Sequence, residues 1–402
     1  MRAQFSLDPH VTNFATFLLS SHPRPVREAI ARHARLLDRD AKHYLDEQEG
    51  SKGAEAAVRR AGARYLDVDP DELALTDSTT MGLGLLYGGL RLPPGTEVLT
   101  TTHDFYSTHE SLRLRTLRTG AAVRKIRLYA DPRTASVDEI VSAVRNGVRD
   151  ATRALAVTWV HSSTGVKLPI RAIADLLADV NRDRSPDDRV LLCVDGVHGF
   201  GVEAATPREL GCDFLVSGCH KWLFGPRGTG VIWGAPDAWS SVTPTIPTFD
   251  PRAFPHWLDD QAPPLSGIPG LPRALAMTPG GFHSFENRWA LREAFDFRRA
   301  IGRVRAALRT QQLASHLKDG LRSIRGVRLI TPSSPELSSG LVCFTVGDRD
   351  PVDVMSDLYD RARVVATVTP YATRYSRLGP SILNSPNDLE RVLRALHSLV
   401  SA

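Results

Sequence analysis

Two ionisable residues follow apolar runs that read as strands, and together they indicate a specific chemistry. Asp195 ends the run 190–195, and Lys221 lies a few residues beyond the next run, 213–217. In open α/β sheets, ligands bind at the edge where the carboxyl ends of the strands meet. A lysine amine there can form a Schiff base with an aldehyde, and a carboxylate can pair with a pyridinium nitrogen. This pair of residues therefore predicts a site for pyridoxal phosphate.

Lysine is rare in this chain, which makes Lys221 informative. The 402 residues include 50 lysines and arginines, of which only six are lysine. They are Lys42, Lys52, Lys125, Lys167, Lys221 and Lys318. Because arginine serves as the ordinary surface cation, a retained lysine is expected to be needed for an amine that can lose its proton. The apolar residues that follow it, Trp222, Leu223 and Phe224, indicate burial, which lowers the pKa of a lysine.

Two further groups of residues extend this interpretation. His198, three residues after the aspartate, is placed to approach the edge of the ring and its phenolic oxygen. Residues 76–82 open a helix after a strand, with free backbone N–H groups and hydroxyls that can hold an anion. Alone, this segment would be read as a plain helix N-cap. Together with the lysine it predicts a phosphate site that uses Thr79 and Thr80.

The glycines nearby do not fit a dinucleotide cofactor. Gly82, Gly84 and Gly88 lack the spacing of the dinucleotide fingerprint, and they lie inside the predicted helix. A nicotinamide-dependent dehydrogenase is therefore not supported.

The elements that must position these residues alternate between helix and strand. Helical patterns are predicted over 24–38, 51–66, 79–90, 107–118, 136–148 and 170–181. Apolar, β-branched strand patterns are predicted over 72–76, 96–100, 122–128, 153–160, 190–195, 213–217 and 230–234. This alternation predicts an α/β fold, with a mostly parallel sheet covered by helices on both faces.

Shifts in composition divide the chain into four predicted parts. They are an N-terminal arm, 1–20; a large cofactor-binding domain, 21–285, with a proline-rich insert at 235–275; one long connecting helix, 286–325; and a small C-terminal α/β domain, 326–402. Long ordered loops such as the proline-rich insert often line a site.

The sequence around the aspartate and the lysine resembles the class V aminotransferase group of fold type I pyridoxal-phosphate enzymes. This group includes cysteine desulfurases, kynureninases and isopenicillin N epimerases. The resemblance rests on 194–198 and 217–222, and the form Cys-His-Lys-Trp at 219–222 is most similar to the isopenicillin N epimerase branch. It covers nearly the whole chain. It implies a large domain with a mostly parallel seven-stranded sheet, a small C-terminal α/β domain, and a homodimer with its sites near the interface.

The resemblance also assigns roles to residues of this chain. It implies that Lys221 is the Schiff-base lysine, that Asp195 is the partner of the pyridinium nitrogen and that His198 is the neighbour of the ring oxygen. These three are the expected catalytic residues. Ser217 and His220, beside the lysine, are further expected cofactor contacts. No metal is expected.

Two loops supply the remaining expected contacts around the ring. In the family, a histidine or an aromatic residue in one of them stacks on the pyridine ring. An ungapped count places Phe105 there, and His103 and Tyr106 are alternatives. In the loop after the 153–160 strand, Ser162 stands where desulfurases carry an asparagine, and it is expected to reach the ring oxygen or the substrate.

Residues 375–385 resemble the segment that holds the substrate α-carboxylate in this family. Arg377 takes the position of the arginine and Asn384 that of the asparagine, whereas Gly379 replaces the usual serine. Arginine suits this role because its planar fork binds a carboxylate through two parallel hydrogen bonds. An amino-acid-type substrate is therefore expected.

Two departures from the family pattern bear on the reaction. Desulfurases hold a nucleophilic cysteine on a loop just before this arginine, but 367–374 contains none. Cys343 lies in an apolar strand pattern, where a small buried hydrophobe is expected. Sulfur transfer through a persulfide is therefore not expected. Within 278–287, the Gly-Thr element that reaches the partner's cofactor phosphate is also absent. The candidates to replace it are Thr278, His283 and Ser284.

The composition argues against several other classes of protein. With 42% hydrophobic and 24% charged residues, the chain is ordinarily globular. The net charge of +5 comes from basic residues spread along the chain, so nucleic-acid binding is not expected. No apolar run reaches the roughly 18 residues of a membrane span. The four scattered cysteines predict neither disulfides nor a zinc site. The N-terminus lacks a signal-peptide pattern, which predicts a cytoplasmic protein.

The reaction type stays open from the sequence. An enzyme is favoured over a non-enzymatic descendant of the fold because Asp195, Lys221 and Arg377 are all retained. The bond that is cleaved depends on its angle to the ring, which sequence does not show. Motif likeness favours epimerisation at the α-carbon. The alternatives are β-elimination from a cysteine conjugate, and then transamination or deamination. The proline-rich insert favours a bulky or unusual substrate, as in secondary metabolism.

Overall fold

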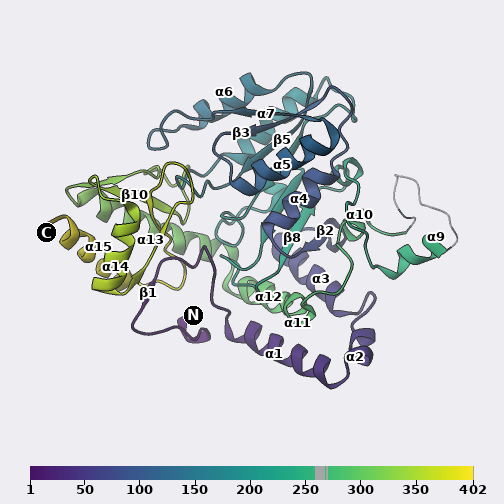
Figure 1. Ribbon diagram of the computed structural model, residues 1–402, viewed down its shortest axis with the longest axis horizontal. Helices are drawn as coiled ribbons and strands as arrows, with labels where there is room; N and C mark the ends of the chain where they lie inside the picture. The colour runs from purple at the N-terminus through teal and green to yellow at the C-terminus, as the bar shows by residue number, and fades with distance from the viewer. Residues whose placement is uncertain (259–267, 269, 402) are drawn as a thin grey trace.

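A seven-stranded sheet lies at the centre of the computed structural model, which describes residues 1–258, 268 and 270–401 (Figure 1). The strand order is β2-β8-β7-β6-β5-β3-β4. The strands are β2 (Leu73–Thr76), β3 (Glu97–Thr101), β4 (Ala122–Ile126), β5 (Thr152–Thr158), β6 (Leu191–Asp195), β7 (Phe214–Gly218) and β8 (Gly230–Gly234). Only β8 runs antiparallel to its neighbours. The predicted α/β fold with a mostly parallel seven-stranded sheet is therefore confirmed.

Three helices precede the first strand of this sheet, and five more connect its strands. They are α1 (Arg24–Arg39), α2 (Ala41–Glu47), α3 (Ala54–Leu66), α4 (Thr79–Gly89), α5 (Tyr106–Thr119), α6 (Val137–Gly147), α7 (Ile170–Asn181) and α8 (Pro207–Leu210). The predicted helices agree with these to within a few residues, except that α2 and the short α8 were not predicted. Long amphipathic patterns predict helices well, whereas a single turn leaves little periodicity.

Alternate side chains of the central strands enter two separate cores. On β5, Leu155 and Val157 belong to one core, and Ala154 and Ala156 belong to the other. Residues of α3, α6 and α7 fill the first core, and residues of α4 and α5 fill the second. Because successive side chains of a strand point to opposite faces, a sheet covered on both faces needs apolar residues at every position. This requirement explains the unbroken apolar runs in the sequence.

The strand register brings the loops that carry the predicted site residues to one edge of the sheet. Thr158, the last residue of β5, pairs with Asp195, the last residue of β6. Asp195 also pairs with Val216 near the end of β7. The loops after β5, β6 and β7 therefore leave the sheet together, at the carboxyl edge where ligands bind in open α/β sheets.

The long helix predicted over 286–325 is not continuous, which corrects the sequence prediction. The structure has α11 (Phe285–Trp289), α12 (Leu291–Ile301) and α13 (Arg303–Ser323) in its place. Gly302, with a φ of +88°, separates the last two. Glycine tolerates this backbone conformation, which cannot continue a right-handed helix. The sequence pattern did not predict the break because an isolated glycine is compatible with a helix interior.

The C-terminal residues form a second, smaller sheet, which is antiparallel with the order β12-β13-β10-β9. Its strands are β9 (Val327–Leu329), β10 (Val342–Val346), β12 (Thr367–Val368) and β13 (Ser376–Leu378). The helices α13, α14 (Pro351–Ala362) and α15 (Pro386–Ser401) pack in its core together with Phe14 of the N-terminal arm. The arm also pairs β1 (Thr12–Asn13) with β11 (Val364–Val365). The small C-terminal α/β domain is thus confirmed, while the exact limits of the four parts stay predictions.

The proline-rich insert, 235–275, is only partly described. It contains η3 (Ala238–Ser241), η4 (Pro251–Ala253), α9 (Phe254–Leu258) and α10 (Arg273–Ala276), and its residues 259–267 and 269 lie outside the described residues. In Figure 1, α9 stands away from the central sheet, on the side opposite the small domain.

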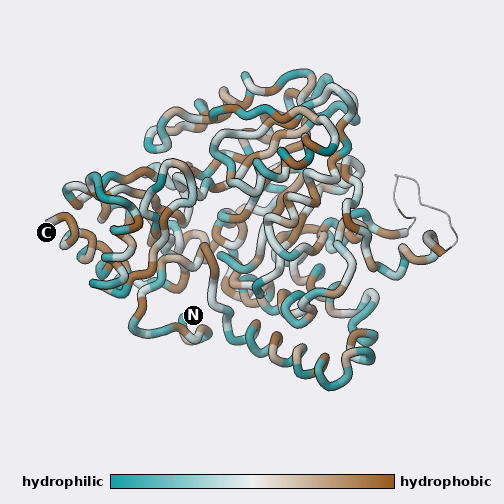
Figure 2. Tube along the Cα trace, viewed as in Figure 1, coloured by the Kyte–Doolittle hydropathy of each residue, from teal (hydrophilic) through white to brown (hydrophobic). Residues whose placement is uncertain are grey.

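Many apolar residues lie on and around the strands of the central sheet (Figure 2). The helices α1 and α2, at the lower edge of the molecule in this view, carry many hydrophilic residues. Within the described residues, no helix is long and apolar enough to cross a membrane. The described chain also contains no group of three histidine, cysteine or acidic side chains that could hold a metal ion. The cytoplasmic location expected from the sequence stays a prediction.

Candidate active site

Asp195 and Lys221 lie in the same buried region, and each alters the proton affinity of the other. Asp195 is 1% exposed, and Val197 N donates a hydrogen bond of 3.0 Å to its Oδ1. Burial raises the pKa of Asp195 to about 7, although the Val197 amide and the charge of Lys221 both act to lower it. Burial likewise lowers the pKa of Lys221 to about 8, against the opposing effect of the Asp195 charge. Both shifts reflect charged groups held away from water.

The two groups are not paired directly. In the described part of the chain, no ion pair within 4.0 Å joins the Lys221 amine to the Asp195 carboxylate. Among the described residues, the Asp195 carboxylate accepts a hydrogen bond only from the Val197 amide. A buried acid and a buried amine of this kind call for a bound group that satisfies both. Pyridoxal phosphate has the required ends, because its ring nitrogen suits the carboxylate and its aldehyde suits the amine.

His198 packs close to this pair. It is 5% exposed, and burial holds its pKa well below the ordinary value, with the charges of Lys221 and Arg377 acting in the same direction. The Trp222 indole Nε1 donates to His198 Nδ1 at 3.4 Å. This contact fixes the plane of the imidazole and leaves Nε2 available to a ligand. The position is compatible with the expected contact to the ring oxygen.

A polar cradle lies where α4 and α5 begin. Thr79 opens α4, and its Oγ1 accepts a hydrogen bond of 2.7 Å from Gly218 N at the end of β7. Thr80 and Ser107 share a hydrogen bond of 2.9 Å between their hydroxyls, which joins the first turns of the two helices. Unpaired N–H groups in first turns attract anions. Thr79 and Thr80 therefore fit a phosphate, and Ser107 is an additional member that the sequence did not single out.

The end of β7 is packed too tightly for a larger residue beside this cradle. A Cβ at Gly218 would lie 3.0 Å from His220 Cε1 and 3.2 Å from Thr79 Oγ1. Ser217 is fully buried and donates to Gly218 O at 3.0 Å. The His220 carbonyl is held by Ser20, through its amide at 3.0 Å and its hydroxyl at 2.8 Å. Ser217, on β7, and His220, directly before Lys221, are thus held in fixed positions in the segment that leads to the lysine.

Phe105, His103 and Tyr106 were the candidates to stack on the pyridine ring of the cofactor, and their surroundings in the structure differ. His103 instead stacks on Tyr129, with ring centroids 4.0 Å apart, and its Nε2 accepts from Leu128 N at 3.2 Å. Tyr106 is 68% exposed. Phe105 is partly buried, and its ring meets the ring of Tyr371 edge-on at 5.9 Å. Phe105 is therefore the candidate that this geometry supports.

Arg377 lies on β13 and reaches from the small domain to the large one. Its Nη1 donates to the Ser162 carbonyl at 2.8 Å, and its Nε donates to Thr367 Oγ1 at 3.0 Å. Its Nη2 forms no hydrogen bond with any described residue. Burial lowers the pKa of Arg377, which is 4% exposed, and its guanidinium lies 4.6 Å from the ring centroid of Phe17. A buried guanidinium whose Nη2 has no hydrogen-bond acceptor among the described residues is well suited to bind a carboxylate.

Two aromatic residues of this region escaped the sequence analysis. Tyr371, between β12 and β13, shares a hydrogen bond of 2.7 Å with Ser162 Oγ. Phe17, from the N-terminal arm, is fully buried, stacks on Trp222 at 6.1 Å and meets His198 edge-on at 6.0 Å. Both come from segments distant in sequence from the residues they touch. The only indication in the sequence was Tyr371 itself, which lies in the segment 367–374 where desulfurases carry a cysteine.

Asn384 and Gly379, in the segment 375–385, have structural contacts. The Asn384 side-chain oxygen accepts from Ser381 N at 2.9 Å, and its Nδ2 donates to Asn13 O at 3.1 Å. The Asn384 amide therefore holds the arm and a turn, and its role in binding substrate stays a prediction. A Cβ at Gly379 would lie 2.1 Å from Phe17. The glycine that replaces the usual serine thus makes room for the arm.

The 278–287 segment leaves the choice between its three candidates open. Thr278 Oγ1 accepts from Leu75 N at 3.1 Å, which ties it to the sheet. His283 Nε2 lies 3.6 Å from Glu55 Oε1, and the Ser284 hydroxyl donates to Glu286 at 2.7 Å. Phe282 is 83% exposed. A cavity of about 760 Å³ opens beside this segment and also reaches the described part of the proline-rich insert.

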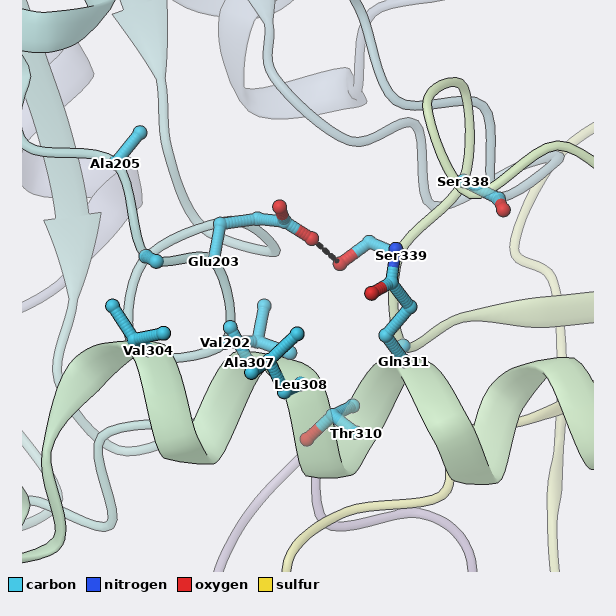
Figure 3. Close-up of a pocket in the computed structure, with 12 residues that line it drawn as sticks. Val202, Glu203, Ala205, Val304, Ala307, Leu308, Thr310, Gln311, Ser338 and Ser339 are labelled. Atoms are coloured by element: carbon cyan, nitrogen blue, oxygen red, sulfur yellow. Dashed lines mark hydrogen bonds between the residues drawn. The ribbon is translucent and has the colours of Figure 1, made fainter.

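A separate, smaller cavity of about 240 Å³ lies where α13 meets the large domain (Figure 3). The Ser339 hydroxyl donates to the Glu203 carboxylate at 2.5 Å, and Val304 and Leu308 of α13 also line the cavity. None of the predicted site residues lines this cavity. It is therefore distinct from the region of Asp195 and Lys221.

Known proteins similar to this chain agree with the fold and with a dependence on pyridoxal phosphate. A model of the family described as aminotransferase class-V matches residues 39–368. Isopenicillin N epimerase from Amycolatopsis lactamdurans is 28% identical, over 99% of this chain and 97% of that protein. A probable cysteine desulfurase from Streptomyces coelicolor is 23% identical, over 86% of this chain and 78% of that protein.

Among solved structures, a cystine C–S lyase in complex with its reaction product, cysteine persulfide, has a TM-score of 0.83 and 19% identity, covering 97% of this chain and 98% of that one. At this identity the likeness supports the fold alone. The fold and the site define a fold type I enzyme that depends on pyridoxal phosphate. The chain belongs to the aminotransferase class-V family, and it is related to isopenicillin N epimerase and cysteine desulfurase.

Proposed function

We propose that this enzyme inverts the configuration at the α-carbon of an amino acid or amino-acid conjugate, in the manner of isopenicillin N epimerase. The loop 367–374 carries the proposal, because it holds Tyr371 and no cysteine. Without a thiol at this place, sulfur transfer lacks its nucleophile, and proton transfer at the α-carbon is the chemistry that the site retains. The whole-length relationship to an epimerase supports the same choice.

In this proposal the cofactor acts as an electron sink for the bond that breaks at the α-carbon. Asp195 would hold the ring nitrogen, and the cradle of Thr79, Thr80 and Ser107 would hold the phosphate. Phe105 would cover one face of the ring. Lys221 would attach the cofactor, and its amine in the neutral form would accept or return the α-proton.

Incubation with substrate candidates in deuterium oxide tests this function. Isopenicillin N, L-cystine and the L and D forms of alanine and methionine would be supplied to the holoenzyme. Epimerisation predicts deuterium at the α-carbon together with the mirror configuration. Release of ammonia or of a keto acid without inversion would instead identify deamination or transamination.

The alternative is β-elimination from a cysteine conjugate. It is favoured by the same buried Lys221 amine, because removal of the α-proton also precedes loss of a β-substituent. Formation of pyruvate and a sulfur product from L-cystine, with no inverted amino acid, would replace epimerisation by this activity.

Replacing Arg377 with alanine is expected to weaken capture of the substrate by about 30-fold or more. Loss of a bidentate charged contact in a desolvated site costs about 2–5 kcal/mol. The affinity for the cofactor is expected to stay unchanged, because its predicted contacts lie on the large domain. Substrate KM and cofactor binding would be measured separately. Arg374→Ala is the matched control, since Arg374 is exposed and pairs with Asp350 at 2.6 Å. Loss of cofactor with unchanged substrate affinity would refute the assignment.

The enzyme is also expected to be a homodimer. Phe249, Phe254 and Phe282 are 54%, 44% and 83% exposed around the cavity beside 278–287, and exposed aromatic residues of this kind mark protein contacts. Sedimentation should give a dimer, and Phe282→Ser should weaken it. Leu117→Ser is the control, because Leu117 is 69% exposed and lies outside the cavity. A fully active monomer would contradict this expectation.

A further inference from the structure

The hydroxyl of Tyr371, in the small domain, contacts the residues that are expected to surround the substrate. Its phenolic oxygen lies 2.7 Å from Ser162 Oγ, and its ring meets Phe105 edge-on at 5.9 Å. Ser162 is in turn held through its carbonyl by Arg377, the expected anchor of the substrate carboxylate. The phenol therefore stands beside the group that would fix the α-carbon.

The strand order places Tyr371 and Lys221 on opposite sides of Asp195. The sheet runs β7-β6-β5-β3 across this region. Lys221 follows β7, Asp195 ends β6, Ser162 follows β5, and Phe105 follows β3. Since Tyr371 contacts the residues after β5 and β3, a ring held on Asp195 has the lysine amine toward one flank and the tyrosine hydroxyl toward the other.

The surroundings of Tyr371 keep its hydroxyl protonated. Burial raises the pKa of Tyr371, as does the charge of Asp104, while the hydrogen bond with Ser162 and the charge of Arg377 act to lower it. The phenol is thus a proton donor at neutral pH. Ser162 is its only hydrogen-bond partner in the described chain, so its own proton can turn to a ligand.

From this arrangement we propose that Tyr371 delivers the proton to the α-carbon on the face opposite Lys221. This inference rests on the proposed function, because only inversion requires proton transfer at two faces. It adds to that function a second acid–base residue, and it gives the cysteine-free loop a chemical purpose.

The proton balance closes within the site and the solvent. The neutral Lys221 amine takes the α-proton, so that the C–H bond breaks and its electron pair stays on the substrate. The Tyr371 O–H bond then breaks, and its proton forms a new C–H bond on the other face. This leaves an ammonium on Lys221 and a phenolate on Tyr371. Transfer of one proton from the ammonium to the phenolate, through water, restores both groups.

The test compares Tyr371→Phe with the wild type in deuterium oxide, using the two enantiomers of the best substrate from the panel above. The variant keeps the aromatic ring and loses only the hydroxyl. Inversion should fall by about 100-fold or more, the usual scale for loss of a general acid. The enantiomer whose α-proton faces Lys221 should still exchange that proton for deuterium, without inversion.

The matched control is Tyr375→Phe, which removes a hydroxyl from the same connection between β12 and β13. The backbone of Tyr375 forms hydrogen bonds with Thr369. This variant should invert substrate at the wild-type rate. Equal losses of inversion and exchange in Tyr371→Phe, or no loss of either, would overturn the proposal.

A second readout does not depend on turnover. Titration of the apo-forms with pyridoxal phosphate, followed by absorbance, should give the same dissociation constant for Tyr371→Phe and the wild type. A marked weakening would mean that Tyr371 holds the cofactor, which contradicts the proposed role. If the wild type inverts no substrate of the panel, the proposed function fails and this role fails with it. If the wild type inverts substrate and the variant is unaffected, only the role of Tyr371 is lost.

Discussion

Replacing Lys221 with alanine is expected to abolish covalent attachment of the cofactor and to lower turnover by about 10⁴-fold. The amine is the buried one that shares a site with Asp195 and Arg377. Borohydride reduction followed by peptide mapping should place the cofactor label on Lys221 in the wild type. The alanine variant should carry no label.

Two other lysines serve as controls for this assignment. Lys167 pairs with Glu203 at 3.1 Å, and Lys42 is exposed and pairs with Asp46. Lys167→Ala and Lys42→Ala should both keep the label and most of the activity. A label found on either residue in the wild type would remove Lys221 from its role.

The pH dependence of cofactor uptake gives an independent check on the same amine. Only the neutral amine attacks an aldehyde, and with a pKa of about 8 roughly one-tenth of it is neutral at pH 7. At the ordinary pKa of 10.5 the neutral fraction would be about 300-fold smaller. The rate of uptake by the apo-protein should therefore rise about tenfold per pH unit up to pH 8 and then level off. A rise that continues to pH 10 would show that the amine is not desolvated.

The proximity of Asp195 and Lys221 could be predicted from the sequence because both residues lie at or just after the ends of strands. An apolar run in a parallel sheet ends at a known edge, so Asp195 and Lys221 could be placed together before any contact was known. The rarity of lysine added a second, independent indication. The α/β fold followed from the same alternation of apolar strands and amphipathic helices.

The contacts that Tyr371 and Phe17 make in the site could not be predicted from the spacing of residues in the sequence. Tyr371 and Ser162 are 209 positions apart, yet they share a hydrogen bond. Phe17 reaches Arg377 and His198 from the opposite end of the chain. Such contacts depend on how the small domain and the N-terminal arm dock against the sheet. A single sequence contains no periodic signal for that docking.

Motif matching assigned Asn384 a role in binding substrate, and the structure adds contacts of its side chain that the motif did not predict. Asn384 matches the family pattern, but its amide holds Ser381 and Asn13. Thr79 and Thr80 show the converse: a segment that alone would be a plain helix start becomes a cradle through Gly218 and Ser107. In both cases the residue type was known from the sequence, and the hydrogen-bond partners in the structure indicated what the side chain does.

Replacing Asp195 with alanine is expected to weaken binding of the cofactor and to lower turnover by about 100- to 1,000-fold. Without a bound partner, burial raises the pKa of this carboxyl to about 7, so that it is about half protonated at neutral pH. A pyridinium nitrogen beside it would supply the opposite charge, which would lower the carboxyl pKa and keep the ring nitrogen protonated. The protonated ring is what stabilises charge at the α-carbon.

Asp195→Asn separates the charge from the shape of this side chain. The asparagine can still accept the hydrogen bond of 3.0 Å from Val197 N, so the loop after β6 should keep its fold. Its neutral amide cannot hold the ring nitrogen in its protonated form. Turnover should therefore fall nearly as far as in the alanine variant, while cofactor affinity falls less. Affinity would be measured by absorbance titration and turnover by α-proton exchange. An asparagine variant with most of the wild-type turnover would mean that the charge of Asp195 does not support the reaction.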